Sequence, residues 1–494
     1  MSDNLLEALS LFLTFQNVGI LFLGVLIGAI VGAIPGITTP MGVALALPFT
    51  FTMHPVTGIL LLLGIYKGGL YGGSITAILI KAPGTPAASC TVLDGYPLTR
   101  KGEARKALDI ALYASCFADF VSNLSLILLA GLLAGFALKF GPPEFFTLIV
   151  FSLTIIAGVS GRNLVKGMVS AALGLLFATI GLDMVYGTNR FIFDNWNLMG
   201  GLSFIPVLIG LFALPEIIHY FAQKLSDVRE ATTVSGAGAG MADFRRCFKS
   251  ILRGSLIGVV LGAIPGIGGA PSAFLSYSEA RRTSANSRNF GKGELEGVAA
   301  AEAGNNGVAG ATMIPLLALG VPGDVITAVI LGAFMIHGLR PGPVMFVDNL
   351  PMIYALFIGI MLSSAYLFVI GKFSIKAISR ISEVPNRILY PVVLVFCLFG
   401  SFAINNSMFD VLMMVLMGCV GYVMMLLRFP APPFLIAFIL GPLLEDNFRQ
   451  SMILSEGELG ILVRSGICWF FWALTLLSLV FLVRSRKQNI PLSG

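Results

Sequence analysis

The stretch LIGAIVGAIPGI at residues 26–37 returns as LIGVVLGAIPGI at residues 256–267, with nine of the twelve positions identical. A second pair of related blocks follows in the same order, YGGSITAILIKAPGT at residues 71–85 and AGATMIPLLALGVPGD at residues 309–324. The first pair is offset by 230 residues, and the Pro-Gly dipeptides of the second pair are offset by 239. Two matches in the same order and at nearly the same offset indicate an internal duplication of the chain.

The composition places both copies in a membrane. Of the 494 residues, 56% are hydrophobic and only 11% are charged, and the mean hydropathy is +0.91. A soluble protein needs more charge than this, so the chain is predicted to be an integral membrane protein. Apolar runs of about 20 residues, the length that crosses a bilayer, recur from residues 17–34 to residues 464–485. Because some are separated by half-length segments, we predict an all-α polytopic membrane protein with roughly ten to twelve transmembrane elements.

The duplication divides the chain into a first membrane repeat at 1–222, a linker at 223–247 and a second membrane repeat at 248–494. The linker is polar, contains SGAGAG and is predicted to be cytoplasmic and loosely ordered. Four Lys and Arg residues at 100–106 follow Pro83-Gly84, whereas Arg340 alone follows the equivalent Pro322-Gly323 in the second copy. Because short cytoplasmic loops are rich in Lys and Arg, equivalent loops are predicted to lie on opposite sides of the membrane, which makes the repeats inverted.

Each copy combines a stripe of glycines with Pro-Gly dipeptides. The stripe at Gly24, Gly28 and Gly32, repeated 230 residues later, is typical of transmembrane helices that pack closely. Proline removes a backbone donor and glycine tolerates non-helical dihedral angles, so each Pro-Gly is predicted to break a helix within the membrane. In the second copy, basic residues both precede and follow the apolar run around PGIGGAP, which favours two half-spans that meet in a re-entrant hairpin.

Paired breaks in inverted repeats predict a central binding site, because they expose backbone groups that lipid cannot satisfy. Helix N-termini that open after the breaks direct unpaired N–H groups and positive partial charge at an anion such as a carboxylate. Freed carbonyls and polar side chains could hold a coupling cation, for which Asn305, Asn306 and Asp324 are the candidates. The alternative for each residue is that it is a small residue at a helix crossing. The candidate substrate-binding residues are Pro35, Gly36, Thr38, Thr39, Ser74, Thr76, Lys81, Pro83, Gly84, Thr85, Pro86, Pro265, Gly266, Gly268, Gly269, Asn305, Asn306, Pro322 and Gly323.

Charged residues inside apolar runs are costly and are usually functional or paired. For Lys67 the sequence leaves three interpretations open: contact with a substrate carboxylate, pairing with Asp119 or Asp324, and extension to the membrane interface. For Lys81 we favour contact with substrate, because it adjoins the Pro83-Gly84 break and is expected to be buried near the midplane. Pairing of Lys81 with the same two aspartates is the alternative. Glu302 is another charged residue inside an apolar run, and it too is expected to be functional or paired.

Other functional classes are weaker matches. Ser160 lies in a GxSG sequence like that of rhomboid-type proteases, and Asp324 follows glycine as in aspartyl intramembrane proteases, but such short matches arise freely. A passive anion channel normally presents a symmetric ring of groups from several subunits. Six scattered cysteines without a CxxC pair or a histidine cluster indicate no metal site, and basic residues confined to short loops indicate no nucleic-acid partner. We therefore predict a protein without catalytic residues or cofactors, apart from a coupling H⁺ or Na⁺.

Seven sequence blocks, in order over nearly the whole chain, are more specific than any short motif. They are GAIPGITTPMGVALALPFTF (32–51), YGGSITAILIKAPGTPAAS (71–89), DGYPLTRKGEARKAL (94–108), GPPEFF (141–146), EAGNNGVAGATMIPLLALGVPGD (302–324), IHGLRPGP (336–343) and LGPLLEDNFRQS (440–451). Through these blocks the chain closely resembles the large membrane subunit of the tripartite tricarboxylate transporters, the TctA family.

The resemblance implies a permease of the bacterial inner membrane that works with a small membrane subunit (TctB-like) and an extracytoplasmic solute-binding protein (TctC-like). It implies uptake of citrate and other small carboxylates, driven by a proton or sodium gradient. Lys67, Lys81 and Asp324 depart from the family pattern, where uncharged residues are expected, so the carboxylate class is predicted rather than citrate itself. The resemblance places substrate and ion contacts at Pro83, Gly84, Thr85, Pro86, Asn305 and Asn306.

Overall fold

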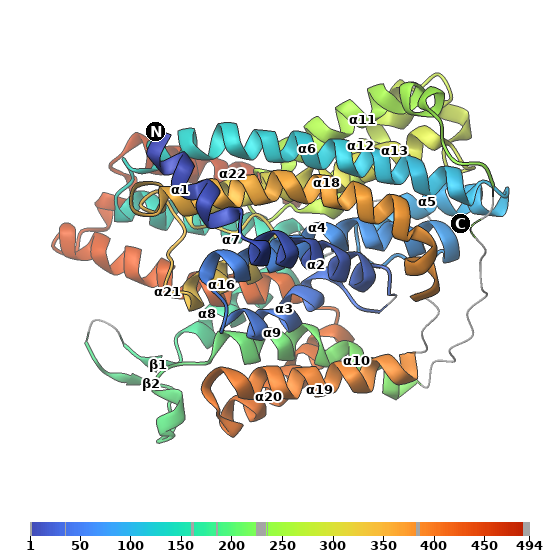
Figure 1. Cartoon of the computed structure of the whole chain (residues 1–494). Helices are drawn as coiled ribbons and strands as arrows, with labels where there is room; N and C mark the ends of the chain where they lie inside the picture. The colour runs from blue at the N-terminus through green and yellow to red at the C-terminus, as the bar shows by residue number, and fades with distance from the viewer. Residues whose placement is uncertain are drawn as a thin grey trace. The chain divides into compact units, whose positions relative to one another are not determined.

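The apolar runs of the sequence form helices, and the only sheet among the described residues is one short antiparallel β-hairpin (Figure 1). This computed structural model describes residues 2–34, 36–159, 163–183, 186–223, 234, 236–381 and 386–487. The elements before the predicted linker are α1 (Ser2–Phe12), α2 (Phe15–Gly32), α3 (Thr39–Thr50), α4 (Pro55–Ile80), α5 (Ala88–Arg100), α6 (Ala104–Ala137), α7 (Pro142–Val159), α8 (Leu164–Ala178), β1 (Gly181–Leu182), β2 (Asn189–Arg190), η1 (Trp196–Leu198), α9 (Phe204–Phe212) and α10 (Leu214–Gln223). The later elements are α11 (Met241–Gly262), α12 (Gly269–Thr283), η2 (Ser287–Asn289), α13 (Leu295–Asn306), α14 (Val308–Ala311), α15 (Met313–Leu319), α16 (Val325–Ile336), α17 (Met345–Asp348), α18 (Leu350–Ile381), α19 (Asn386–Asn405), α20 (Met408–Leu426), α21 (Ala431–Leu454), η3 (Leu459–Val463) and α22 (Gly466–Lys487).

Seven helices of the described residues are long and apolar enough to cross a membrane, and shorter apolar helices accompany them. The helical, polytopic membrane fold predicted from the sequence is confirmed. The long segments are Phe15–Gly32, Pro55–Ile80, Ala104–Ala137, Phe204–Ala222, Leu350–Phe373, Arg387–Asn405 and Met408–Leu426. The shorter ones are Thr39–Thr50, Pro142–Gly158, Leu164–Ala178, Val325–Ile336 and Gly466–Val480.

The described helices form two compact units. Unit 1 contains residues 1–134 and 216–407, and unit 2 contains residues 135–215 and 408–494. Each unit takes one segment from each half of the chain, so the units cut across the predicted repeats. The predicted repeat boundaries therefore do not coincide with the boundaries of the compact units, and the division into repeats remains a prediction.

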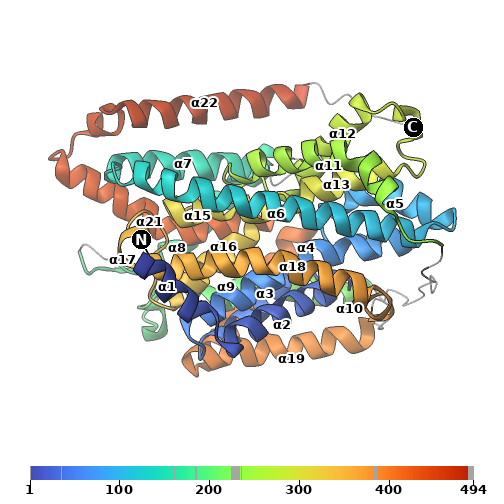
Figure 2. The ribbon, with the colours of Figure 1, turned by 45° about the horizontal axis from the view of Figure 1, so that its top comes forward.

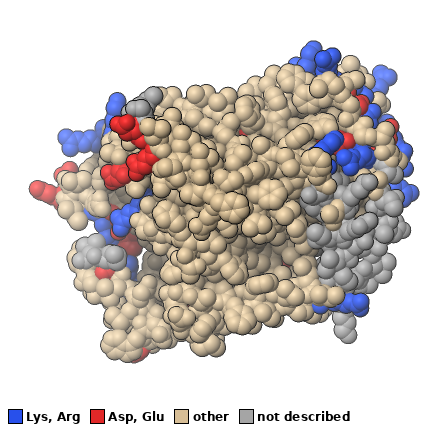
Figure 3. Space-filling view, viewed as in Figure 1, with Lys and Arg blue, Asp and Glu red and all other residues tan. Residues whose placement is uncertain are grey.

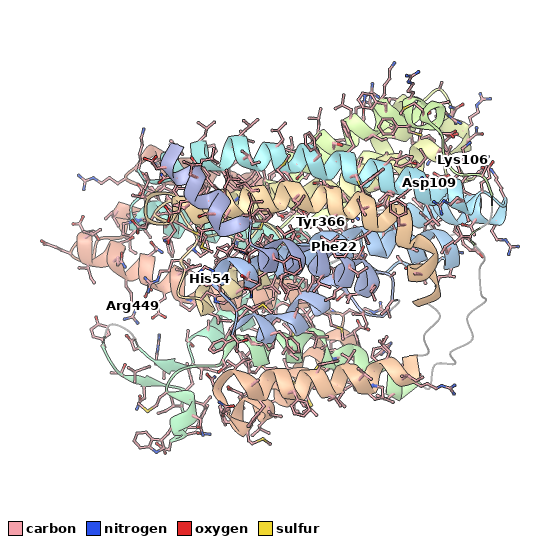
Figure 4. The ribbon with its side chains drawn as sticks, viewed as in Figure 1. Phe22, His54, Lys106, Asp109, Tyr366 and Arg449 are labelled. Atoms are coloured by element: carbon pink, nitrogen blue, oxygen red, sulfur yellow. The ribbon has the colours of Figure 1, made fainter. Side chains whose placement is uncertain are left out.

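The second half of the predicted linker is held in place. Most of residues 224–235 lie outside the described residues. Beyond them, the Ala239 N–H donates a hydrogen bond to Asp109 Oδ2 at 3.1 Å, and Lys106 forms an ion pair with Asp243 at 2.8 Å. Lys106 and Asp109 lie at the same end of α6 (Figure 4). The chain that leads into the second copy is therefore fastened to α6, where loose order was expected.

Within unit 1 the glycine stripes pack as the sequence predicts. A Cβ on Gly24 would lie 2.6 Å from a backbone oxygen of α4, and a Cβ on Gly28 or Gly32 would come closer still. In the second copy, a Cβ on Gly258 would lie 2.7 Å from the Gly307 Cα. Thus α2 packs on α4, and α11 on the end of α13, with backbone against backbone. The close-packing interpretation of the stripes is confirmed.

The two copies run in opposite directions. Successive glycines of α2 meet successive turns of α4, and successive glycines of α11 meet successive turns of α13 and α14, so each pair is parallel. Between the copies, Asn305 Nδ2 donates to the Leu70 carbonyl at 3.3 Å, while Tyr66 OH lies 3.1 Å from Thr312 Oγ1. The later residue of α4 meets the earlier residue of the second copy, so these helices are antiparallel. This is the arrangement of inverted repeats.

The segment around PGIGGAP forms a helical hairpin. Arg253, within α11, donates a hydrogen bond to Thr283 at the end of α12, so α12 runs back along α11. Figures 1 and 2 both show α11, α12 and α13 lying side by side. The chain enters at the basic end of α11, turns at the break and returns to the same end, as the flanking charges predicted.

Basic residues collect at this end of unit 1, where α5 and α12 end and α6 and α11 begin. Arg246 pairs with Glu294, and Lys372 pairs with Asp109 at 3.3 Å. Figure 3 shows blue Lys and Arg side chains over the ends of α11 and α12, with uncharged surface along the helices. By the positive-inside rule, we expect this end of unit 1 to face the cytoplasm.

Cysteines placed at Lys101 and Arg340 are expected to be labelled from opposite faces of the membrane. The two residues are 239 positions apart, follow the equivalent helices α5 and α16, and are both exposed. A membrane-impermeant maleimide added to intact cells should label the cysteine at 340, and should label the one at 101 only after permeabilisation. Both cysteine variants also carry Cys419→Ser, because Cys419 is exposed and would itself react with the maleimide. Labelling of both positions from the same face would contradict the inversion.

Unit 2 packs around α21, which lies against α7 and α8, while α9 lies against α20. The β-hairpin is fastened to α21 by ion pairs: Arg449 to Asp183 at 2.7 Å and Arg190 to Glu445 at 2.8 Å (Figure 4 labels Arg449). None of the candidate substrate-binding residues falls in unit 2. The candidate site is therefore built from unit 1 alone.

Candidate functional site

The breaks of each copy meet in space. Gly84, in the loop after α4, lies so close to the Gly32 carbonyl that a Cβ would overlap the oxygen. Its N–H donates to the Gly73 carbonyl at 3.4 Å. In the second copy, the Gly266 N–H donates to the Gly323 carbonyl at 2.7 Å. Two interruptions that are far apart in sequence therefore lie side by side in each copy.

Each copy opens a helix directly after its first break. Helix α3 follows Thr38, and helix α12 follows Gly268, and neither cap residue accepts a hydrogen bond from its helix through a side chain. The first N–H groups of a helix have no partner within the helix, and they carry positive partial charge. Uncapped helix N-termini of this kind attract anions.

The N-terminus of α3 lies directly against α4, and the N-terminus of α12 is connected to the same turn of α4 through Asn305 of α13. A Cβ on Gly69 would lie 2.7 Å from Thr39 Oγ1, so the absence of a side chain lets Thr39 approach. One residue later, the Leu70 carbonyl accepts a hydrogen bond from Asn305 Nδ2. Asn305 Oδ1 in turn lies 2.7 Å from where a Cβ on Gly269 would stand. We call these five residues, Thr39, Gly69, Leu70, Gly269 and Asn305, the break site.

Two polar atoms of the break site, Thr39 Oγ1 and Asn305 Oδ1, have no hydrogen-bond partner among the described residues. Their side chains are buried, with exposed fractions of 0% and 1%. Leaving a buried polar atom unpaired costs about 1–3 kcal/mol, so an unpaired atom calls for a ligand or another specific reason. The hydroxyl can donate to a carboxylate, whereas the amide oxygen can only accept, which suits a substrate hydroxyl or a cation.

Some polar candidates lie next to the break site on α4. Ser74 Oγ is buried and also lacks a well-formed hydrogen bond within the described part of the chain. Thr85 packs against Gly73 and accepts a hydrogen bond from the Ala88 N–H at 3.2 Å. The Thr76 hydroxyl donates to the Gly73 carbonyl at 3.3 Å and is thereby satisfied within its own helix. Of these, Ser74 is the side chain whose hydroxyl is not satisfied by a well-formed hydrogen bond, and it lies near the Glu302 carboxyl.

Other sequence candidates are not brought to the break site. Pro83, Pro86 and Gly36 are exposed, and Gly36, with a φ of 96°, lies against the Tyr390 ring hydroxyl. Pro265 and Pro322 are buried at the breaks themselves. Pro35 and Ser160 lie outside the described residues.

Lys81 ends α4 in the left-handed region, with a φ of 58°. Gly320, 239 positions later, ends α15 in the same conformation with a φ of 71°, so Lys81 stands where the second copy uses glycine. The Lys81 side chain is exposed, and its Nζ lies 5.9 Å from the centre of the Tyr96 ring. The expectation of a lysine buried near the midplane was wrong, because the helix ends before it. Its pairing with Asp119 or Asp324 is also excluded, since both carboxyls have other partners.

Lys67 is fully paired inside unit 1. Its Nζ lies 2.6 Å from Asp119 Oδ1 and 2.6 Å from Asn123 Oδ1. The second Asp119 oxygen accepts from Asn123 at 3.1 Å and from Ser364 at 2.5 Å. Lysine and aspartate are each 1% exposed. Of the three interpretations of Lys67, pairing with Asp119 is confirmed.

Asp324 is the N-cap of α16. Its carboxylate accepts hydrogen bonds from the Thr327 N–H at 2.7 Å and from Tyr66 OH at 2.8 Å. A carboxylate at a helix N-terminus is stabilised by the helix dipole, which gives this charge a structural reason. Gly268 lies next to it, since a Cβ there would be 3.5 Å from the Asp324 Cβ. The role of Asp324 in ion coupling remains a prediction.

Glu302 forms a second polar cluster, one helical turn before Asn306. Its carboxyl accepts hydrogen bonds from Thr91 Oγ1, from Ser115 Oγ at 3.2 Å and from Asn306 Nδ2 at 3.4 Å. Asn306 Nδ2 also donates to Ser115 Oγ at 2.8 Å. From the sequence, Asn306 is a site candidate and Glu302 is only a charge to account for, whereas nothing in the sequence points to Thr91 or Ser115. The i, i+4 spacing of Glu302 and Asn306 on one helix face is the signal that could have joined them.

The arrangement brings two helix N-termini and two buried polar atoms that lack partners in the described structure into one cluster, with an ionisable carboxyl, Glu302, one turn of α13 away. The chain is similar to two proteins of Agrobacterium vitis. An uncharacterized 52.8 kDa protein of the TAR-I ttuC' 3' region of Agrobacterium vitis is 35% identical over 482 residues, which are 97% of this chain and 96% of that protein. An uncharacterized protein of the TAR-II ttuC' 3' region of the same organism is 33% identical over 237 residues, which are 47% of this chain and 98% of that protein. No solved structure gives a match.

The family match covers the break site and both polar clusters. Residues 18–436 match the family described as Tripartite tricarboxylate transporter TctA family. The match takes in both copies of the duplicated segment, from the first glycine stripe to α16. The hydrolase alternative built on Ser160 or Asp324 is accordingly set aside, because this is a family of transporters. The chain belongs to the tripartite tricarboxylate transporter TctA family.

Proposed function

We propose that the chain is the membrane permease subunit of a secondary transporter that imports tricarboxylates or related small organic anions. The observation that carries this proposal is the break site. Two uncapped helix N-termini come from oppositely directed copies: α3 lies against Gly69 of α4, and α12 lies against Asn305, which donates to the Leu70 carbonyl of α4. Buried polar atoms without partners in the described structure lie beside them. Helix N-termini stabilise carboxylates, and broken helices at the interface of inverted repeats are the usual substrate site of secondary transporters.

We also propose that the permease works with two partners in the bacterial inner membrane. A small membrane subunit and an extracytoplasmic solute-binding protein, TctB-like and TctC-like, follow from the tripartite organisation that the family name describes. The solute-binding protein would deliver the carboxylate to the extracytoplasmic end of the permease. Import would be coupled to a proton or sodium gradient, because accumulation of an anion against the membrane potential needs a co-transported cation.

The test is uptake of labelled carboxylates into proteoliposomes that contain the permease with both proposed partners. Citrate, succinate and a neutral sugar are compared under an inward proton gradient, an inward sodium gradient and no gradient. We expect at least one carboxylate, and no sugar, to accumulate above its external concentration, and only when a cation gradient and the binding protein are present. Carboxylate flux that merely equilibrates without a gradient would favour a passive anion channel. Absence of carboxylate flux under all conditions would reject the proposal.

A further inference from the structure

The buried carboxyl groups of the described residues differ in how their charge is compensated. Four of them pair with Lys or Arg, and these are Asp109, Asp119, Asp183 and Glu294. Two others lie at helix N-termini, where backbone N–H groups and the helix dipole stabilise negative charge. Asp94 accepts from the Gly293 and Glu294 N–H groups at the start of α13, each at 2.8 Å, and Asp410 lies in the first turn of α20.

Glu302 has neither kind of compensation. Its side chain is 0% exposed, and its hydrogen-bond donors, Thr91, Ser115 and Asn306, are all neutral. It is the eighth residue of the twelve in α13, well past the helix N-terminus. Within the described part of the chain, no Lys or Arg forms an ion pair with it. Ser74 approaches the carboxyl from α4, out of good hydrogen-bond geometry, and is neutral as well.

The titratable groups around Glu302 supply no compensating cation either. Tyr71 of α4 and Cys90 of α5 are near enough to interact with its charge. The basic residue that also acts on Tyr71 is Arg105 of α6, which is itself paired with Asp109. The other groups that act on Tyr71 or Cys90, namely Cys116, Asp109 and Asp94, are not cationic. Lys106 and Arg246, which are basic residues of α6 and α11, pair with Asp243 and Glu294 and not with Glu302.

A buried carboxylate without a cationic partner is several kcal/mol less stable than one in an ion pair, so such a group takes up a proton or another cation. The orientation of the Asn306 side-chain amide shows whether the carboxyl is suited to a proton or to a metal cation. Its Nδ2 donates to the Glu302 backbone carbonyl at 3.1 Å, and a carbonyl can only accept, so the amino group is the side that faces the carboxyl. A metal cation would need oxygen ligands there. The neutral hydroxyls of Thr91, Ser115 and Ser74 can all serve a protonated carboxyl as donors or acceptors.

We propose that Glu302 is the carboxyl that carries the coupled proton during transport, an inference that rests on the proposed function. The carboxylate binds one proton from the extracytoplasmic side to form a neutral acid, and it releases that proton to the cytoplasmic side as the carboxylate re-forms. Glu302 lies close to the proposed substrate site in the chain and in space. Asn306 donates to Glu302, and the next residue, Asn305, belongs to the break site. Substrate binding and protonation thus act on the same turn of α13.

The principal variant is Glu302→Gln, which keeps a side chain of the same shape but cannot ionise. In proteoliposomes that carry the permease and its partners, we expect carboxylate counterflow, which needs no net proton movement, to stay within about threefold of wild type. Accumulation driven by an imposed proton gradient should fall by at least about tenfold, and the remaining flux should lose its pH dependence. The matched control is Glu296→Gln, on the same helix, whose partners are Ser250 and Asn286 and which should behave as wild type.

A second variant keeps the test valid if glutamine prevents folding. Ser115→Ala removes one donor to the carboxyl and leaves the acid in place. Because that donor stabilises the charged form, its loss should let Glu302 hold its proton more tightly. One hydrogen bond is worth about 1 kcal/mol, so the pH of half-maximal uptake should rise by roughly half to one unit. Infrared difference spectra of the purified protein give a readout besides transport, since a protonated carboxylic acid has a C=O band distinct from that of a carboxylate.

The outcomes separate this inference from the proposed function. Proton-driven, pH-dependent accumulation that is unchanged in Glu302→Gln would overturn the inference while leaving the transporter intact. Accumulation driven by sodium without a proton gradient would overturn it as well. If the wild type moves no carboxylate at all, the proposed function fails. A pH-dependent carboxylic acid band that is lost in Glu302→Gln would then still establish a buried proton site at Glu302.

Discussion

Replacing Gly84 with leucine is expected to abolish transport and to remove most of the folded protein from the membrane. A Cβ at this position would overlap the Gly32 carbonyl oxygen and would stand 3.0 Å from the Gly73 Cα. The Gly32 backbone cannot retreat, because α2 is packed on α4 along its whole glycine stripe. Overpacking of this kind costs about 3 kcal/mol or more, which lowers the ratio of folded to unfolded protein by about a hundredfold. The measurement is the amount of monodisperse protein after detergent extraction, followed by uptake per folded molecule.

The matched control is Gly131→Leu in α6. Gly131 is also a glycine of a membrane-crossing helix, but a Cβ there meets no atom within 4 Å. Substitution at this position should be neutral or slightly stabilising, since glycine is about 1 kcal/mol worse than the best helix formers in a helix interior. If Gly84→Leu extracted and transported as well as Gly131→Leu, the close approach of the two breaks would not be required.

Replacing Lys67 with methionine is expected to destabilise the protein by about 3–5 kcal/mol, because it leaves Asp119 as a buried charge without its cation. Methionine keeps the volume of the lysine stem, so lost packing contributes little. Asn123 and Ser364 would remain as neutral donors to the carboxylate, which is not enough to offset a bare charge at 1% exposure. Protein abundance in the membrane and the midpoint of thermal unfolding in detergent should both fall sharply.

Removing the second charge tests whether the loss is electrostatic. The double variant Lys67→Met with Asp119→Asn has no buried charge at this pair of positions, and the asparagine amide can donate to Asn123 Oδ1 in place of the lysine. Abundance and unfolding midpoint should return close to wild type, together with uptake. A double variant that folds but does not transport would show that this ion pair takes part in transport itself, contrary to its assignment as a structural pair.

The sequence predicts the architecture of unit 1 where the physical cause is local. Glycines four residues apart allow close helix packing, and a Pro-Gly dipeptide cannot continue a helix, so the stripe at Gly24, Gly28 and Gly32 and the breaks at Gly84 and Gly266 are readable directly. The reversed distribution of basic residues in the two copies likewise indicates inversion. Thr39 and Asn305 are also identified as candidates, because they follow a break or belong to the GNN block.

What the sequence could not decide depends on distances between segments far apart in the chain. Lys67 has three plausible partners in sequence, and only the packing of α4 against α6 selects Asp119. Lys81 looks buried because apolar residues precede it, yet α4 ends before it and leaves it exposed. Glu302 is distinguished from other buried acids by the lack of a cation nearby, which no local pattern records. The pairing of residues 1–134 with 216–407 in one unit is also invisible in the sequence.

The central claim, that the break site binds the carboxylate, is tested most directly by the thermal stability of purified Thr39→Val. Valine keeps the shape of threonine and its contact with Gly69, and it removes a hydroxyl that has no partner within the described structure. Without substrate, the variant should therefore be as stable as wild type or more stable, by about 1 kcal/mol. A carboxylate that is transported, added at 100 times its Kd, should stabilise the wild type by about 2.7 kcal/mol. At the same carboxylate concentration, that stabilisation should fall to about half or less in Thr39→Val, because a hydrogen bond to a charged group is worth about 1.5–3 kcal/mol, and it should be kept in Gly131→Leu. Equal stabilisation of Thr39→Val and wild type by the same carboxylate would contradict a substrate site at the break.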